Sequence, residues 1–364
     1  MSLLSLSLNA VERGLIPDAI TRSAIRRLCE QRLRDSDRGN DIANERALQA
    51  FVASMVAGPV APVPDKANEQ HYELPPEFFA AVLGPRRKYS SCFFTEASST
   101  LAEAEEAALA ITCERAQLAD GQEILELGCG WGSLSLWMAE RYPRSRITAV
   151  SNSAPQRGFI EAEAAARGLT NLQIITADMN DFAVGRVSNP SSPESTARPG
   201  RDGIPSYDRV VSVEMFEHMR NYAKLLERIS GWLRPTGKLF IHIFCHRRFA
   251  YPFETDGDSN WMGRYFFTGG IMPSEHLLQR FDQHLKVAQQ WRWNGQHYQR
   301  TSEAWLRNLD EQRQKVMPIL ESCYGRAEAR RWFHRWRMFF LAVAELFGYA
   351  NGEEWFVTHA LLER

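Results

Sequence analysis

The chain has 364 residues, of which 44% are hydrophobic and 24% are charged, and its formal net charge is -1. These proportions are typical of a globular protein, and the balanced charge gives no electrostatic support for a nucleic-acid partner. Six cysteines without paired spacing, and no secretory leader, favour the cytoplasm over an oxidising compartment. The longest apolar run, residues 338–347, is interrupted by Glu345 and is much shorter than the roughly 20 residues of a transmembrane helix.

The N-terminal part of the chain is predicted to be helical, and the middle part to alternate between strands and helices. Apolar residues such as Ile25, Leu28 and Phe51 recur at helical spacing until a group of prolines ends the pattern. Regular alternation after that point indicates a doubly wound parallel sheet, an α/β fold. The predicted strands span residues 123–127, 146–150, 172–176, 209–213 and 238–244, with two more near 287–293 and 355–361. The predicted helices span residues 101–117, 133–141, 156–166 and 222–232.

This pattern divides the chain into four parts. Residues 1–75 form an N-terminal helical extension, 76–245 a ligand-binding α/β core, 246–345 a helical, aromatic-rich lid, and 346–364 a final strand that returns to the core sheet. Residues 185–206 contain four prolines among serines and glycines. Such a segment cannot bury enough apolar surface to offset its ordering entropy, so it is predicted to be a disordered surface loop.

A glycine-rich turn follows the first predicted strand, with Gly128, Gly130 and Gly132 after Glu126. Glycines permit a tight turn and a close approach of the backbone to a ligand. The Gly-x-Gly-x-Gly spacing differs from the Gly-x-Gly-x-x-Gly of dinucleotide sites. An acid before the glycines suits a ligand with a positive group, such as the α-amino and sulfonium ends of S-adenosylmethionine. A purely structural strand-to-helix turn is the alternative.

The next two strands end in residues that suit a nucleoside. Asn152 and Gln156 could bond ribose hydroxyls, although they lack the charge of the usual acid. Asp178 offers an acceptor for an adenine amino group, and Met179 offers a thioether for the face of the ring. Asp178 could instead cap a turn. Because ligands of open α/β sheets bind outside the carboxyl ends of the strands, we expect these residues to form one site.

The fourth strand ends in a group of acids next to a histidine. If the chain turns helical there, Glu214, Glu217 and His218 share one face through their i, i+3 and i+4 offsets. Two carboxylates beside an imidazole could bind a cationic amine and remove its proton, and only the neutral amine has a lone pair for methylation. The alternative is that these acids complement a helix dipole.

The fifth strand carries two histidines, and aromatic residues become dense after it. Alternation places His242 and His246 on one face. We expect them to line a substrate pocket, and no metal site, because a third and fourth ligand are missing; His246 could also be structural. Most of the late aromatic residues should form core, and a few facing the cleft would cage an aromatic or cationic substrate. They are Trp261, Tyr265, Phe266, Phe267, Trp291, Trp293, Tyr298, Trp305, Trp332, Trp336 and Tyr349.

These motifs resemble the cyclopropane fatty-acid synthase superfamily of S-adenosylmethionine-dependent methyltransferases, and within it the coclaurine N-methyltransferase group. The resemblance covers nearly the whole chain, including residues 89–94, the glycine turn and residues 347–355. It implies a Rossmann-like class I methyltransferase fold with a helical lid inserted late in the sheet. It also implies N-methylation of a small aromatic or heterocyclic amine, with S-adenosylmethionine as the cofactor.

The resemblance also implies roles for single residues. Glu214, Glu217 and His218 would line the amine site. Tyr89 and Ser90 would close over the cofactor, and Trp336 and Arg337 would lie near the substrate.

Two features keep a lipid substrate open as an alternative. Cyclopropane synthases hold a bicarbonate ion with a cysteine, a glutamate, a histidine and a tyrosine, and by resemblance Cys92, Glu217, His242 and Tyr298 match those positions. The amine-methylating enzymes carry a carboxylate where this chain has His242. Methyl or methylene transfer to an unsaturated lipid chain is therefore the second hypothesis. The basic cluster at residues 86–88 could attract an anionic headgroup or be a solvated loop.

A third hypothesis is a protein that binds S-adenosylmethionine without catalysis. It would leave the acids and the histidine after the fourth strand without a purpose. The oligomeric state is left open, with a homodimer as one option.

Overall fold

The structure, a computed structural model, describes residues 3–63, 74–184 and 206–364. The predicted disordered loop therefore lies outside the described residues, apart from Ser206. The chain begins with the helices α1 (Leu3–Glu12), α2 (Asp18–Ser36), α3 (Asp41–Ala57), α5 (Pro76–Val82) and α6 (Leu101–Arg115). The central elements are β1 (Glu123–Leu127), α7 (Ser133–Arg141), β2 (Arg146–Ser151), α8 (Ala154–Ala166), β3 (Leu172–Thr176), β4 (Tyr207–Val213), α9 (Tyr222–Trp232) and β5 (Leu233–His246).

The C-terminal part supplies the lid and the last two strands of the sheet. Its elements are β6 (Tyr251–Pro252), α10 (Trp261–Tyr265), β7 (Ile271–Met272), β8 (Lys286–Trp293), α11 (Gly295–Glu311), α12 (Arg313–Tyr324), α13 (Arg326–Gly348) and β9 (Trp355–Glu363). Among the described residues no helix is long and apolar enough to cross a membrane.

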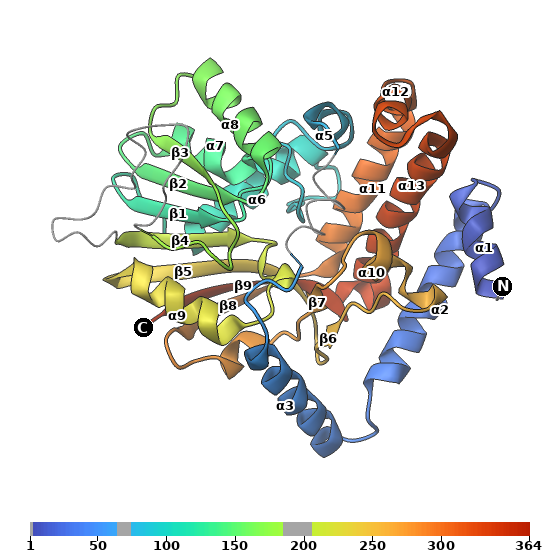
Figure 1. Ribbon diagram of the computed structural model, residues 1–364, viewed down its shortest axis with the longest axis horizontal. Helices are drawn as coiled ribbons and strands as arrows, with labels where there is room; N and C mark the ends of the chain where they lie inside the picture. The colour runs from blue at the N-terminus through green and yellow to red at the C-terminus, as the bar shows by residue number, and fades with distance from the viewer. Residues whose placement is uncertain (1–2, 64–73, 185–205) are drawn as a thin grey trace.

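The described strands form a seven-stranded sheet in the order β3-β2-β1-β4-β5-β9-β8, and Figure 1 shows these strands side by side. β1 pairs in parallel with both β2 and β4, β2 with β3, and β4 with β5, whereas β9 runs antiparallel to both β5 and β8. The sheet reverses its strand order at β1 and β4, so the carboxyl ends of these two strands border the crevice in which ligands of such folds bind. The α/β class predicted from the alternation of strands and helices is confirmed.

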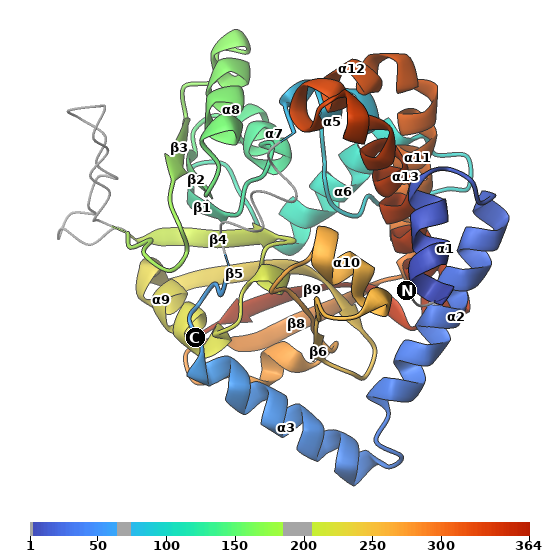
Figure 2. The same cartoon turned by 45° about the vertical axis from the view of Figure 1, so that its right-hand side comes forward.

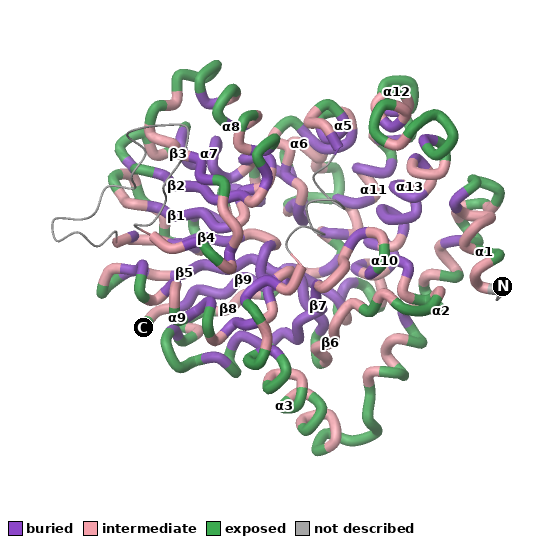
Figure 3. The backbone as a smooth tube through the Cα atoms, viewed as in Figure 1, coloured by how far each residue is buried: buried purple, intermediate pink, exposed green. Residues whose placement is uncertain are grey.

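Helices cover both faces of the sheet because alternate strand residues point to opposite sides. In β1, Leu125 packs in the cluster that contains α9, whereas Ile124 packs in the cluster of α6 and α7. In β4, Val210 and Val211 divide between the same two clusters. Strands buried on both faces read as nearly continuous apolar runs, as these do. Figure 3 shows the strands as buried and α3 as mostly exposed.

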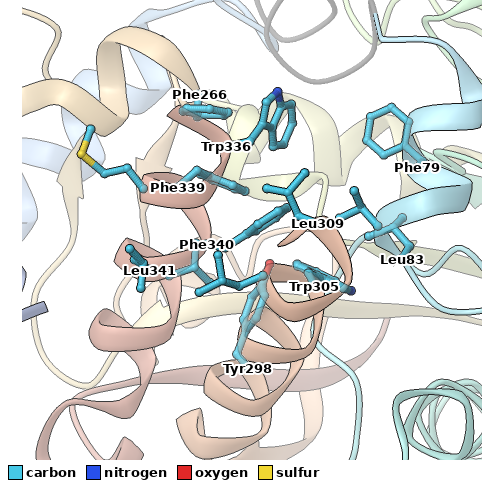
Figure 4. Packing of buried hydrophobic residues seen from close by; sticks show 14 of the residues in the cluster. Phe79, Leu83, Phe266, Tyr298, Trp305, Leu309, Trp336, Phe339, Phe340 and Leu341 are labelled. Carbon is cyan, nitrogen blue, oxygen red and sulfur yellow. The ribbon is translucent and has the colours of Figure 1, made fainter. Parts of the chain in front are cut away.

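The lid is a helical layer with an aromatic interior. Trp336, Phe339 and Phe340 on α13 face Trp305 on α11 and Phe266, and Figure 4 shows these rings close together. The rings of Phe266 and Phe339 stack with centroids 4.3 Å apart. Most of the late aromatic residues are thus core, as expected.

The N-terminal helices dock onto this lid. Arg22 on α2 forms ion pairs with Glu303 on α11 and Glu345 on α13, at 2.5 and 2.8 Å. Figure 2 shows α1 and α2 against α13, on the opposite side of the molecule from β3. The lid therefore packs against α1 and α2 on one side and against the core sheet on the other.

Candidate active site

The glycine turn is built into the core, and only its middle faces open space. All three glycines have positive φ, at 78° for Gly128, 51° for Gly130 and 77° for Gly132. A Cβ on Gly128 would lie 2.8 Å from Met215, and one on Gly132 would lie 2.7 Å from Ile160. A Cβ on Gly130 would meet no described atom within 4 Å. A ligand can therefore approach the backbone at Gly130.

Two pockets meet at this turn. Both are lined by Gly128, Gly130 and Glu214, so together they form one crevice at the carboxyl ends of β1 and β4. The first pocket has a volume of about 720 Å³, counting its space open to solvent. Its lining includes the predicted residues Asn152, Gln156, Asp178, Met179 and His218. The second pocket is lined by the predicted residues Tyr89, Ser90 and Glu126.

The first pocket suits a nucleoside. The Nε2 atom of Gln156 is buried and has no hydrogen-bond partner among the described residues, so it is a donor available to a ligand. The Oε1 atom of Gln156 accepts a 2.6 Å hydrogen bond from Ser151, which fixes the orientation of the amide. Asp178 accepts a hydrogen bond from the backbone N–H of Asn180 at 2.7 Å while also lining the pocket. Both interpretations of Asp178, turn cap and pocket residue, therefore apply.

The second pocket suits a polar, zwitterionic ligand end. Thr112 Oγ1, Trp131 Nε1 and Ser133 Oγ line it, are buried, and have no hydrogen-bond partner among the described residues. Glu126 is buried and accepts a hydrogen bond from Ser135. Burial raises the pKa of Glu126 to about 7, against the lowering effect of the Ser135 hydroxyl. A cation bound beside Glu126 would restore its charge.

The basic cluster at residues 86–88 does not form one exposed patch. Arg86 pairs with Glu106 and Glu140, and Arg87 lies over the ring of Phe159 at 4.3 Å. Lys88 is buried and donates hydrogen bonds to Ser90 Oγ and, at 2.7 Å, to the carbonyl of Ser91. The contacts of Arg86 with acids and of Arg87 with an aromatic ring, and the burial of Lys88, give no support for a headgroup site here.

Glu214 occupies the centre of the crevice with its carboxylate fully hydrogen-bonded. Its Oε1 accepts from the backbone N–H of Ser91 at 3.0 Å and lies 3.2 Å from His242 Nε2. Its Oε2 accepts from the hydroxyl of Tyr298 at 2.7 Å. Burial raises the pKa of Glu214 above its ordinary value, and the charge of Lys88 and the donors Ser91 and Tyr298 oppose this rise.

The chain does not turn α-helical at Glu214. Glu214 has a φ of 47°, and its N–H donates to the carbonyl of His242 across the sheet at 2.9 Å. A short 3-10 turn, Phe216–His218, follows. The predicted i, i+3, i+4 face is therefore wrong, but the tighter turn still keeps the three side chains near one another, since the charge of Glu214 acts on both Glu217 and His218.

Glu217 differs from Glu214 because it lines neither pocket and its carboxylate is incompletely satisfied. Its side chain is 1% exposed, and its Oε2 has no hydrogen-bond partner among the described residues. Burial, and then the negative charge of Glu214, raise the pKa of Glu217 well above its ordinary value. Burial lowers the pKa of His218 to about 4, so the imidazole is neutral near pH 7. His218 stacks on Phe267 with centroids 6.0 Å apart.

Several residues predicted for the substrate site lie elsewhere. His246 is buried against Trp355, and its Nδ1 accepts from two backbone N–H groups, so it has the structural role that was the alternative. Trp336 is packed in the aromatic core of the lid. Arg337 is paired with Asp18 and Asp310 at 2.8 and 2.7 Å. Neither Trp336 nor Arg337 lines the two described pockets.

Cys92 stands behind the crevice. It is fully buried, its N–H donates to Thr301 Oγ1 at 3.0 Å, and its thiol points to the carbonyl of Ser90 at 3.7 Å. Burial raises the pKa of this thiol to about 12. His242 and Tyr298, in contrast, reach the crevice through Glu214.

Comparison with known proteins identifies the family. Residues 63–349 match the family described as mycolic acid cyclopropane synthetase. (S)-Coclaurine N-methyltransferase of Thalictrum flavum subsp. glaucum is 36% identical over 361 residues, which is 98% of this chain and 95% of that protein. The chain belongs to this family.

Other relatives extend the likeness to structure and to lipid-modifying members. A solved structure of coclaurine N-methyltransferase bound to N-methylheliamine and SAH is 35% identical, covers 100% of both chains and has a TM-score of 0.91. Cyclopropane-fatty-acyl-phospholipid synthase of Escherichia coli (strain K12) is 28% identical over 65% of this chain and 55% of that protein. The predicted family, the class I methyltransferase fold and the cofactor S-adenosylmethionine are confirmed. The protein is an S-adenosylmethionine-dependent methyltransferase that acts on a small molecule.

Several residues that line the second pocket were not predicted from the sequence. Ser133 follows Gly132 directly, so its place after the glycine turn was a usable signal. Lys88 was noticed only as part of a basic cluster. Thr112 lies in the last turn of α6 and carries no local signal, because only the packing of α6 beside the glycine turn brings it to the pocket.

Proposed function

We propose that the protein methylates the nitrogen of a small aromatic or heterocyclic amine. The supporting observation is the pair of buried carboxylates beside a neutral histidine at the end of β4, of which Glu217 Oε2 has no partner among the described residues. A buried acceptor without a donor is costly. An amine N–H supplies that donor, and its positive charge offsets the like charges of Glu214 and Glu217.

The residues of the two pockets fit the cofactor. Gln156 and Asp178 would hold the nucleoside, and Glu126 with Thr112 and Ser133 would hold the amino-acid end. When bound, S-adenosylmethionine supplies an electrophilic methyl carbon on a positively charged sulfur. Glu214 lines both pockets and so borders the place where the two parts of the crevice join.

Glu214, Glu217 and His218 would bind the amine in its protonated form and take up the proton that it loses. Glu214 is the better stabilised carboxylate, because the Ser91 N–H and the Tyr298 hydroxyl donate to it, whereas burial and the charge of Glu214 raise the pKa of Glu217 well above its ordinary value. An ammonium ion next to Glu217 favours its ionised form. With a pKa of about 4 the ring of His218 is a weak base in the empty site, and it can accept the proton of the amine only when ionised carboxylates beside it raise its basicity, as the charge of Glu214 does. Positioning the neutral amine within the crevice would supply much of the acceleration.

Aromatic surroundings favour an aromatic or heterocyclic acceptor. Phe267 stacks on His218, and Phe253 contacts Phe267 with centroids 5.2 Å apart. Phe253 also lines a third cavity, together with Trp261 and Met262. Such a wall can stack with a flat ring and attract a cation. Relatives are named for methylating amine nitrogen, including coclaurine and pavine N-methyltransferases.

The lipid alternative has less support from this geometry. His242 and Tyr298 were expected to hold bicarbonate under that hypothesis, but Tyr298 donates to the carboxylate of Glu214, and His242 Nε2 lies 3.2 Å from the same carboxylate. The donors that an exogenous anion needs are therefore occupied by a side chain of the protein itself.

A methyl-transfer screen tests the proposal. We would incubate the enzyme and S-adenosylmethionine with tetrahydroisoquinolines, phenethylamines, imidazoles and unsaturated phospholipid vesicles with and without bicarbonate, and read products by mass spectrometry. N-methylated amine is the expected product. Bicarbonate-dependent lipid modification, without any amine product, would overturn the proposal.

Variants assign the roles within the same screen. His218→Ala and Glu217→Gln should each lower kcat by about 10²-fold or more, the magnitude of lost general acid–base catalysis. Cofactor affinity, measured by calorimetry, should change little. His276→Ala removes an exposed histidine and is the control. Full activity of both site variants would refute the roles given to Glu217 and His218.

The homodimer and the cytoplasmic location stay predictions. Light scattering coupled to gel filtration would measure the first, and fractionation of the source cells the second.

A further inference from the structure

A line of hydrogen bonds runs from Glu214 through the sheet to α6. His242 Nε2 lies 3.2 Å from Glu214 Oε1, and His242 Nδ1 lies 2.8 Å from His359 Nε2. His359 Nδ1 in turn lies 3.1 Å from Nη1 of Arg115. The two histidines face each other in the register of β5 and β9, and both are fully buried. Arg115 is partly buried and lies over the ring of Trp291 at 5.3 Å.

Arg115, at one end of this line, determines which atom donates and which accepts in each hydrogen bond. A guanidinium can only donate, so His359 Nδ1 must accept from Arg115. A neutral His359 then carries its proton on Nε2 and donates to His242 Nδ1. His242 consequently carries its proton on Nε2, where it donates to Glu214.

Both histidines stay neutral in this arrangement. Burial, followed by the positive charge of Lys88, lowers the pKa of His242 well below its ordinary value. Burial, followed by His242, lowers the pKa of His359 in the same direction. A proton added to either ring would place two donors against each other, at Arg115 or between the rings.

We propose that Arg115 and His359 are positioning residues that lock His242 in its Nε2–H tautomer, so that Glu214 Oε1 always receives a donor from His242. In the other tautomer, His242 would turn a lone pair toward Glu214 at 3.2 Å, and the two acceptors would repel each other. Glu214 would then compete with Glu217 for a proton. The expected effect on catalysis rests on the proposed function, whereas the expected tautomers of His242 and His359 are independent of it.

The first test reads the tautomers directly and needs no substrate. The chain has nine histidines, so selective ¹⁵N labelling of histidine with long-range ¹H–¹⁵N spectra is practical, with assignment by single substitution. Both His242 and His359 should show a protonated Nε2 and an unprotonated Nδ1 near pH 7. A protonated Nδ1 on either ring in the unaltered protein would overturn the proposal.

Variants then separate positioning from packing. His359→Phe keeps a ring that can pack between Trp293 and Phe240, whose centroids lie 4.7 and 4.9 Å away, but it removes both nitrogens. His242 should then lose its single tautomer in the spectra. Arg115→Met should have the same effect, because methionine has no N–H to donate to His359, whereas Arg115→Lys should keep the tautomer in part, because a lysine still donates.

Activity on an amine accepted in the screen completes the test. His359→Phe and Arg115→Met should lower kcat about tenfold, the order expected for a lost orienting partner, and should change the KM for S-adenosylmethionine by less than about twofold. Arg209→Met is the matched control, since Arg209 also reaches the end of α6, donating to the carbonyl of Ala116 at 3.0 Å, without touching the histidines. An unchanged kcat in both relay variants would refute the positioning role. If the enzyme methylates no amine, the proposed function is contradicted, but the tautomers measured by NMR still test the positioning of His242.

Discussion

Three buried acids differ in their hydrogen-bond partners: Glu126 and Glu214 line the crevice, and Glu217 lies beside Glu214 outside its lining. Glu214 has a donor on each oxygen, Glu126 has Ser135, and Glu217 has an oxygen without a partner among the described residues. Burial disfavours charge in all three, and the donors decide how strongly. A cationic ligand that binds beside these acids would reduce the free-energy cost of burying them.

Cofactor binding should release protons near neutral pH. The pKa of Glu126 is raised to about 7 by burial, so about half of the molecules carry a proton there at pH 7. A bound ammonium group favours the carboxylate, and affinity should therefore increase from pH 6 to pH 8. Calorimetry in phosphate and in Tris should give different binding enthalpies, and Glu126→Gln should remove the difference. Equal enthalpies for the unaltered protein would contradict this prediction.

Glu217 should destabilise the fold increasingly as pH rises. Its pKa is raised in the folded state, so above the unfolded value of about 4.5 the unfolded chain loses a proton that the folded chain retains. The free energy of unfolding then falls with pH until the folded-state pKa is passed. The melting temperature of Glu217→Gln should exceed that of the unaltered protein by a margin that grows from pH 5 to pH 8. Glu227→Gln, on an exposed position of α9, controls for the loss of a charge, and a margin independent of pH would refute the argument.

At the scale of elements, the turn between β1 and α7 combines packing and binding. Gly128 and Gly132 are required because a Cβ would collide with Met215 and Ile160. Gly130 has the same unusual φ sign but no neighbour, since its free side faces both pockets. The sequence motif thus contains two glycines for the fold and one for the ligand.

Gly130→Ala should separate these roles when compared with Gly121→Ala. Both glycines have positive φ, and a Cβ on either would meet no described atom within 4 Å. Each substitution should lower the free energy of unfolding by about 1 kcal/mol through backbone strain. Only Gly130→Ala should also weaken S-adenosylmethionine binding, because its methyl group enters the crevice. Equal affinities of the two variants in calorimetry would contradict the assignment of Gly130.

At the scale of the whole molecule, the N-terminal helices and the lid share buried charges. Glu12 at the end of α1 accepts hydrogen bonds from Trp261 at 2.9 Å and from Arg335 at 3.0 Å. Arg335 also lies over the rings of Tyr265 and Trp332. The extension is therefore part of the folded lid.

Glu12→Ala should destabilise the protein strongly. It leaves the buried guanidinium of Arg335 without its acid, a change that costs about 3 kcal/mol in comparable buried pairs. Urea denaturation measures the loss. Glu328→Ala removes the exposed partner of Arg331 on the same helix and should cost less than about 1 kcal/mol. Similar losses in both variants would show that docking of α1 does not depend on this pair.

The core of the fold could be predicted because its signals are local. Strands 123–127 and 172–176 and helices 133–141 and 222–232 were predicted with the bounds that the structure has. Hydrophobic periodicity and turn residues act within a few positions, so the chain displays them in order. Parallel topology then brings strand ends together, which is why Asn152 and Asp178 line one pocket.

The internal structure of the site depended on contacts between distant parts of the chain. The hydrogen bonds that join Arg115 to His359, and His359 to His242, span 244 and 117 positions. Periodicity carries no information at such separations, so the sequence could name His242 but not the partners that orient it. The resemblance placed Arg337 near the substrate, but it could not show the ion pairs with Asp18 and Asp310, which come from distant parts of the chain. Residue types and local order were enough for the sheet and the cofactor crevice, whereas the ionisation state of each acid was decided by which donors folding placed around it.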